Sequence, residues 1–343
     1  MRPKLCRLHA IRSWLLVTAA TAAAFCTAPA AAQLLDAPSG GASPGAEAAS
    51  LEPITLKFRV GVEVTAKRGA CRDIYAVVAV PIECPEQSVQ RLEEDFTSHV
   101  AKVDFRELAG GAAKQMLVSI PFLESGDTAR AAVTYEVTVR PTAPLPPGEQ
   151  AELRIPERTP RNLRSYVGPS PFIESKHPKI RRLVRDIEEK LQEQHPDASD
   201  WRRVEFVYDW VLDNIEYLEG DDTSAVTTLD EESADCHGRS ALFVAICRAM
   251  GVPARLVWVQ NHCYPEFYME RPDGEGVWLP AESAGVRAFG EMPLARTILQ
   301  KGDDFRMPER PRERMRYASD FLTGRPVPGS GKPSVKYLRE VVP

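Results

Sequence analysis

The residues best able to do chemistry are a cysteine, a histidine and a glutamate, in that order along the chain. Cys236 precedes an apolar stripe with helical spacing, and Gly251 and Pro253 mark the end of that predicted helix. Residues 254–260 then predict a buried strand. We therefore expect Cys236 at a helix N-terminus, where free N–H groups and the helix dipole favour a thiolate nucleophile. A buried structural cysteine is the alternative.

His262 begins a strand-like run, residues 261–268. A turn signal follows, and residues 277–282 predict a second short strand that ends at Glu282. A thiol, an imidazole and a carboxylate on consecutive elements form the ordered set that amide chemistry needs. The imidazole accepts the thiol proton, while the acid fixes its tautomer and stabilises its charge.

These segments resemble the transglutaminase-like superfamily. In that family Gly-x-Cys opens a helix that ends in Gly-Ile-Pro-Ala-Arg, and His-x-Trp-x-Glu and Trp-x-Pro-x-Asp strands follow. The wider resemblance runs from about Ser175 to Ser283. The matching residues here are Cys236, then Gly251, Val252, Pro253, Ala254 and Arg255, then His262, Tyr264 and Glu266, then Trp278, Pro280 and Glu282.

The resemblance implies a papain-like α+β domain that acts on peptide or glutamine carboxamide bonds through a cysteine thioester, without a metal or organic cofactor. It makes Cys236 the nucleophile, His262 the proton shuttle and Glu282 the residue that orients His262. Hydrolysis is slightly preferred over acyl transfer, because water needs no second binding site. Ala234 replaces a family glycine and Glu282 a family aspartate. These departures keep open a non-catalytic envelope or protein-binding module that retains the fold.

Asp235 and Glu266 are expected as supporting residues of this site. Strand alternation places Glu266 on the same face as His262, where it could support the imidazole, line a groove or serve a structural role. The same alternation points Cys263 to the opposite face. His237 is interpreted as a loop residue.

A zinc site could be imagined from neighbouring side chains, but the sequence disfavours it. The spacing contains no Cys-x-x-Cys or His-x-x-x-His pair, and adjacent ligands suit a tetrahedral site poorly. We therefore expect no metal. The side chains considered are Asp235, Cys236, His237, His262 and Cys263.

The N-terminus predicts export. Residues 1–32 combine a basic start, a short apolar run and a small-residue cleavage site, as in a signal peptide, and an uncleaved membrane anchor is the alternative. Residues 33–50 are expected to be a flexible leader.

Removing four basic residues with the signal makes the formal net charge of −5 more negative. This charge argues against nucleic acid or an anionic membrane surface as a partner.

The remaining chain predicts two domains. Residues 51–140 should form a β-sandwich, residues 141–160 a proline-rich linker, and residues 161–300 the transglutaminase-like domain. Residues 301–343 are expected to be a charged, solvated or wrapping extension. The four expected front strands are residues 55–64, 75–82, 114–120 and 131–139.

Two helices and an acidic loop should precede the nucleophile. The helices have apolar stripes from Ile180 to Leu191 and from Trp201 to Ile215. Residues 219–235 are interpreted as a solvated loop, with substrate steering as the alternative.

Removal of residues 1–32 leaves an odd number of cysteines, so one free thiol is expected if the others pair. The Cys71–Cys84 pair is disfavoured, because both residues flank one expected strand.

The sequence thus predicts a secreted or periplasmic enzyme, a cysteine protease or amidase or a glutamine acyltransferase. Its expected partner is a protein or peptide substrate. Nucleic-acid binding is not expected, nor is stable membrane insertion after signal cleavage.

Overall fold

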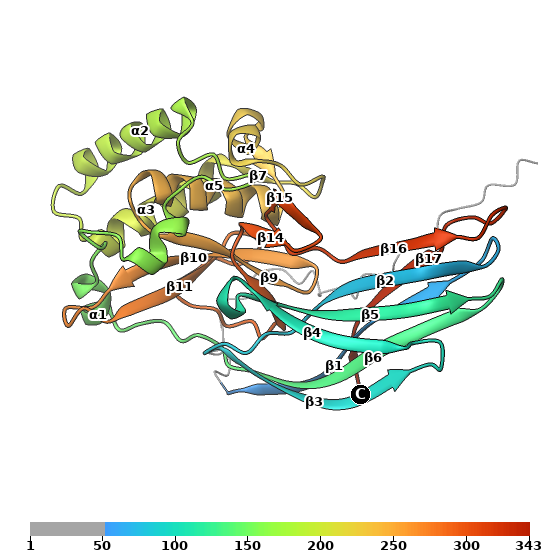
Figure 1. Cartoon of the computed structure of the whole chain (residues 1–343). Coiled ribbons are helices and arrows are strands. Elements are labelled where there is room, and N and C mark those ends of the chain that lie inside the picture. The colour runs from blue at the N-terminus through green and yellow to red at the C-terminus, as the bar shows by residue number, and fades with distance from the viewer. Residues whose placement is uncertain (1–51) are drawn as a thin grey trace, which may run out of the picture. The chain divides into compact units, whose positions relative to one another are not determined.

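A computed structural model describes residues 52–343 (Figure 1). The expected signal peptide and leader lie outside the described residues. The described residues form one compact unit. No helix in the described part of the chain is long and apolar enough to cross a bilayer.

The front of the described chain is built from strands. The four strands expected there are confirmed, and two more are present that the sequence analysis missed. The missed strand β3 is largely polar and mostly exposed, so it gives little apolar alternation to detect, and β4 is only 7 residues long. The six strands are β1 (Ile54–Thr65), β2 (Cys71–Val80), β3 (Gln87–Phe96), β4 (Lys102–Leu108), β5 (Ala113–Leu123) and β6 (Thr128–Val139).

These strands contribute to two sheets that share one hydrophobic cluster. Two strands from the end of the chain take part, β16 (Phe321–Pro326) and β17 (Ser334–Val342). One sheet has the order β17-β1-β6-β3, and the other contains β5, β2 and β16, with β4 beside β5. Val60 and Val133 of the first sheet and Val78 and Val118 of the second are completely buried in the same cluster. Burial of these apolar side chains on alternate strand positions holds the two sheets together.

The second sheet continues without a break into the part of the chain that carries Cys236. Its full order is β12-β11-β10-β9-β13-β5-β2-β16. Strand β13 (Ile298–Lys301) makes the junction, because Gln300 pairs with Trp258 of β9 and with Ala113 of β5. The expected domains 51–140 and 161–300 therefore share a sheet. The remaining strands of this half are β9 (Ala254–Val259), β10 (His262–Glu270), β11 (Gly276–Glu282) and β12 (Ala288–Phe289).

The helices surround α5 (Cys236–Ala249), which packs on β9 and β10, while α2 (Pro178–Gln194) and α3 (Asp200–Asn214) pack on α5 (Figure 1). Residues 238–248 of α5 are all buried, as befits a central helix. Ser199 caps α3 and accepts a hydrogen bond from the Arg202 N–H. Both helices expected before the nucleophile are confirmed.

Two segments differ from the sequence-based expectation of irregular chain. The acidic segment 219–235 contains a helix, α4 (Ala225–Glu231), capped by Ser224, and a short strand, β8 (Ser233–Ala234), which pairs with β7 (Glu216–Tyr217). The proline-rich segment 141–160 contains α1 (Pro147–Glu152) and pairs at Arg154 with Glu270 of β10. The composition of each segment does not reveal its strand pairing, because the paired residues lie outside the segment.

The C-terminal segment 301–343 is folded into the body of the protein. Strand β17 (Ser334–Val342) pairs with β1, and β16 (Phe321–Pro326) pairs with β2, so the segment contributes to both sheets. The sequence analysis expected a solvated or wrapping extension here and did not predict these strands. A hairpin, β14 (Phe305–Met307) and β15 (Arg310–Met315), lies between β13 and β16.

These pairings allow a test of the predicted boundary at residues 141–160. A fragment of residues 161–343 would lack β1, β2 and β5, the partners of β17, β16 and β13. We expect it to be unfolded or aggregated, because unpaired strand edges and an open hydrophobic cluster are exposed. Circular dichroism and size-exclusion chromatography would compare it with residues 52–343 as control. A monomeric fragment with a cooperative melting transition would instead support independent domains.

Candidate active site

The start of α5 holds the proposed nucleophile. Asp235 is the N-cap, and its Oδ1 accepts hydrogen bonds from the N–H groups of His237 at 2.9 Å and Gly238 at 3.0 Å. Gly238 must be a glycine here, because a Cβ would lie 2.2 Å from Thr223 Oγ1 and 2.5 Å from Ala234 Cβ. This cap fixes the direction of the first turn, so that Cys236 is its first residue.

The surroundings of Cys236 favour the thiolate. Its pKa is lowered to about 4, first by the neighbouring Cys263 thiol and then by His262 and by the charge of His237. Burial opposes this change, since only 6% of the residue is exposed. The positive end of the α5 dipole acts in the same direction as these neighbours. Cys236 is therefore expected to be ionised at neutral pH.

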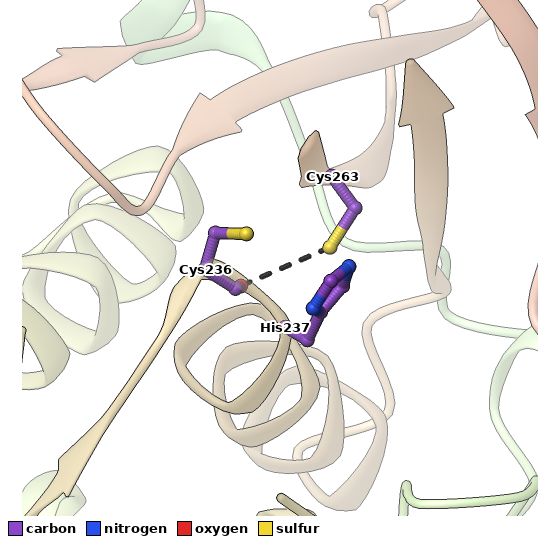
Figure 2. A group of neighbouring side chains, drawn as sticks. All are labelled: Cys236, His237 and Cys263. Carbon is purple, nitrogen blue, oxygen red and sulfur yellow. Dashed lines mark hydrogen bonds between the residues drawn. The ribbon is translucent and has the colours of Figure 1, made fainter. Parts of the chain in front are cut away.

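Cys263 lies beside Cys236 (Figure 2). Its thiol donates to the Cys236 carbonyl oxygen at 3.8 Å, and burial is the main reason that its own pKa is raised. As expected, the Cys263 side chain points to the opposite face of the sheet from Tyr264 and Glu266. Helix α5 covers that face, so Cys263 lies next to the nucleophile. The sequence analysis treated this direction as leading away from the site, because it did not place α5 on that face of the sheet.

His262 joins the thiol to the acid. Its Nε2 contacts Oε1 of Glu282 at 2.9 Å and Oε2 at 3.1 Å, which leaves the other ring nitrogen, Nδ1, available to Cys236, whose pKa His262 lowers. Burial alone would lower the pKa of His262, but the hydrogen bonds of Cys236 and Glu282 raise it to about 9. Between about pH 4 and 9 the site therefore holds a thiolate and an imidazolium.

Glu282 reaches His262 despite its additional methylene. The residue is 2% exposed, and its oxygens also accept from the Ala284 N–H at 3.0 Å and from Arg296 Nη1 at 3.1 Å. These donors offset the cost of burying a carboxylate. Arg296 was missed by the sequence analysis, because it lies in an irregular segment without a local pattern.

Three further residues hold the end of β11 against the helices. The Tyr208 hydroxyl donates to the Glu282 carbonyl at 2.5 Å and accepts from the Ala288 N–H at 3.1 Å. Ser240 Oγ of α5 lies 2.7 Å from Ser283 Oγ, and Arg239 Nη1 donates to the Ser283 carbonyl at 3.1 Å. These contacts fix the Glu282 backbone relative to the helix that carries Cys236. Tyr208 lies within the apolar stripe from Trp201 to Ile215, and that pattern gave no sign of this role.

The two expected supporting residues have different roles. Asp235 shapes the site by capping α5 and by contacting His237 Nδ1 at 2.9 Å. Glu266 instead binds Arg255 at 2.7 Å and Lys301 at 2.8 Å inside the sheet. Burial raises the pKa of Glu266, but these two cations outweigh it and lower the pKa below its usual value. Its contacts indicate a structural role. His237, expected in a loop, belongs to the first turn of α5.

Side chains near the nucleophile could hold a cation. The sulfur and nitrogen atoms of Cys236, His237 and Cys263 lie within 4.8 Å of one another, as do the ligand atoms of Asp222, Asp235 and His237. Two sulfurs and an imidazole would suit a soft cation such as Zn²⁺. Such an ion would occupy the sulfur that the proposed chemistry needs, so the first set can serve either role but not both together.

The described cysteines are all unpaired thiols. Burial raises the pKa of Cys84 to about 12 and raises that of Cys71 and Cys247 as well. Cys236 is thus distinguished from these three by its hydrogen bonds and charged neighbours.

Residues 185–283 match the family model of the transglutaminase-like superfamily. This segment includes Cys236, His262 and Glu282. It is a transglutaminase-like domain, as the motif resemblance predicted. No curated protein matches the chain.

Two solved structures are similar to the chain at low sequence identity. A candidate cysteine protease of Cytophaga hutchinsonii is 16% identical, with 85% of this chain and 93% of that chain covered and a TM-score of 0.49. A candidate protease of Parabacteroides distasonis is 11% identical, with 66% and 48% covered and a TM-score of 0.25. The chain spans about half of the second protein.

The lowered thiol pKa gives a direct test. We expect iodoacetamide to alkylate Cys236 at a rate that falls only as the pH drops through about 4, because protonation then removes the thiolate. His262→Ala should move the midpoint toward the ordinary value of about 8.5 and slow alkylation at pH 6 by at least about tenfold. Mass spectrometry would follow the reaction, with Cys84→Ala as control. A wild-type midpoint near 8.5 would contradict the ion pair.

The contacts of Tyr208 predict a stability effect. Tyr208→Phe leaves the buried Glu282 carbonyl and Ala288 N–H without this partner, so we expect a loss of about 1–3 kcal/mol in the free energy of unfolding. Tyr217→Phe is the matched control, because Tyr217 is 41% exposed and should change stability by less than about 0.5 kcal/mol. Urea unfolding measures both. Equal stability of the two variants would mean that the Tyr208 hydroxyl does not hold β11.

Proposed function

We propose that this transglutaminase-like protein is an exported cysteine hydrolase that cleaves peptide or glutamine carboxamide bonds through a thioester. The observation that carries the proposal is His262, whose Nε2 contacts the buried Glu282 carboxylate and which lowers the pKa of the Cys236 thiol. A structural cysteine needs neither an adjacent imidazolium nor a carboxylate behind it. The combination is the one that nucleophilic catalysis requires.

The chemistry follows from the protonation states. The Cys236 thiolate attacks the carbonyl carbon, and the carbonyl π electrons move to oxygen. When the tetrahedral intermediate collapses, the C–N bond breaks and His262 gives its proton to the leaving nitrogen. Water then attacks the thioester, His262 accepts a proton from it, and the carboxylic acid leaves as the thiolate is restored. Glu282 keeps the imidazole oriented throughout.

Backbone geometry supports stabilisation of the intermediate. Cys236 is the first residue of α5, where the N–H has no partner within the helix. This donor and the positive end of the dipole would favour an oxyanion near Cys236. The second donor of this oxyanion site is not assigned.

The proposed setting is the periplasm or the extracellular space, with a protein or peptide as the substrate. The signal-like sequence of residues 1–32 and the acidic net charge support it. The proposed front β-sandwich, residues 51–140, would serve as a scaffold, and its strands support the sheet through β13. Neither nucleic acid nor a membrane is part of the proposal.

Hydrolysis and acyl transfer can be separated by a substrate profile. Peptides and glutamine donors would be tested with and without a primary amine, and products identified by mass spectrometry. Hydrolysis gives an acid in both cases, whereas transfer gives a new amide only with the amine. Turnover that persists in Cys236→Ala would refute the thioester. A protein without turnover on any substrate that nevertheless binds peptides would favour a binding module.

The role of Glu282 can be tested with two variants. Glu282→Gln should lower kcat by about 10²-fold or more, because it removes the charge that orients and stabilises the imidazolium. Glu282→Asp keeps the charge and should retain part of the activity. Full activity of Glu282→Gln would indicate a Cys–His dyad.

The kcat of the wild type should decline below about pH 4, where the thiolate gains a proton, and above about pH 9, where the imidazolium loses one.

A further inference from the structure

A cavity of about 580 Å³ adjoins the proposed catalytic residues. His237 and His262 line one side, and the C-terminal segment lines the other with Arg314, Arg316 and Arg339. Arg314 belongs to β15 and Arg339 to β17, while Arg316 follows β15 directly. Cys236 does not line the cavity itself, but its neighbour His237 and the imidazole of His262 do, so a ligand in the cavity lies between these histidines and the guanidinium groups.

Arginine is the commonest charged residue in the cavity lining. The chain has a formal net charge of −5, yet three arginines and a single carboxylate, Asp222, line the cavity. Each arginine is paired with an aspartate: Arg314 with Asp304, Arg316 with Asp222 and Arg339 with Asp320. The guanidinium N–H groups that these pairs leave free are the donors available to an anion.

Two of these arginines are held in place by the protein. Arg316 is stacked over Phe172, with its guanidinium carbon 4.3 Å from the ring centre, and its side chain is 13% exposed. Arg339 binds Asp320 through Nη2, while its buried Nε has no hydrogen-bond partner among the described residues. Stacking and ion pairing fix the planes of the two groups, which lowers the entropic cost of binding a ligand.

Asp222 indicates what this cavity can bind. Its carboxylate contacts Arg316 through one oxygen and His237 Nδ1 at 2.6 Å through the other. Its side chain is 45% exposed, so it is the accessible partner in both pairs. A carboxylate thus already lies between the arginine side and the histidine side of the cavity. A substrate carboxylate could use the remaining N–H groups of the same arginines.

We propose that this arginine-lined cavity selects substrates that carry a carboxylate next to the scissile amide, so that the enzyme prefers acidic peptides. Arg316 and Arg339 are the specificity-determining residues, and the aromatic rings of Trp258 and Tyr317 form the apolar wall between them and α5. The inference rests on the proposed function, because it assigns the substrate class of the same site. It also explains why the C-terminal segment, remote from Cys236 in sequence, lies beside it.

The first experiment needs no substrate. Iodoacetate and iodoacetamide alkylate the same thiolate with loss of iodide, but only iodoacetate carries a carboxylate. We expect Arg316→Gln and Arg339→Gln each to lower the ratio of the iodoacetate rate to the iodoacetamide rate at Cys236 by about threefold to tenfold. Arg316→Lys should largely retain the ratio. Asp222→Asn should raise it, because the competing anion is removed.

Arg312→Gln provides the matched control. Arg312 lies on β15 with the same charge but outside the cavity lining, so its removal should leave the ratio unchanged. The iodoacetamide rate of each variant reports whether the thiolate site is intact, which separates misfolding from a loss of charge. If both Arg→Gln variants keep the wild-type ratio, or if Arg312→Gln lowers it equally, the cavity does not recognise carboxylates and the proposal fails.

The second experiment measures selectivity on amides. Peptide pairs that differ only by Glu or Gln next to the scissile bond should show a higher kcat/KM for the acidic member. Arg316→Gln should raise KM for that member alone. Turnover without this preference would overturn the inference while leaving the proposed hydrolase intact. If no peptide is cleaved, the hydrolase proposal fails, and the alkylation ratio still decides whether the cavity binds a carboxylate.

Discussion

The site depends on keeping one carboxylate charged in a place where water hardly reaches it. Glu282 is 2% exposed, and a buried charge is costly unless donors surround it. His262, Arg296 and the Ala284 N–H supply those donors. The charge of Glu282 in turn stabilises the imidazolium, which helps to keep Cys236 ionised. The ionised state of Cys236 therefore depends on His262, and the imidazolium of His262 depends on Glu282.

Such a chain of interactions requires that α5 and the end of β11 keep a fixed separation. The contacts of Ser240 and Arg239 with Ser283 provide it locally. At the other end of α5, the buried pair Arg248–Asp303, with Nη2 2.7 Å from Oδ2, ties the helix to the segment after β13. Strand β13 also pairs with β5, so the helix is anchored to strands from the front of the chain. Strands β1 to β6 thereby stabilise the geometry of the site without contributing one of the proposed catalytic residues.

The C-terminal segment has two roles, and the path of its backbone allows both. Strands β16 and β17 complete both sheets, and the path that takes them there places Arg314, Arg316 and Arg339 along the cavity beside His262. Nucleophile strength and substrate selection can therefore be separated. The former depends on α5, β10 and β11, whereas the latter would depend on side chains that approach from the end of the chain. Changes in the arginines can alter selectivity without touching the ion pair.

The sequence alone determined the elements whose signals are local. Helical periodicity and the Gly251–Pro253 stop located α5, and strand patterns located β9, β10 and β11, so Cys236, His262 and Glu282 could be named in advance. The tertiary structure decided what depends on distant partners: strands β3 and β4, the pairing of β16 and β17, and the approach of Arg296, Cys263 and Tyr208 to the site. Glu266 shows how far sequence patterns reach. Strand alternation predicted which face of β10 carries it, but only its contacts with Arg255 and Lys301 indicate a structural role. Periodicity tells which face a side chain occupies, whereas long-range packing decides what it meets there.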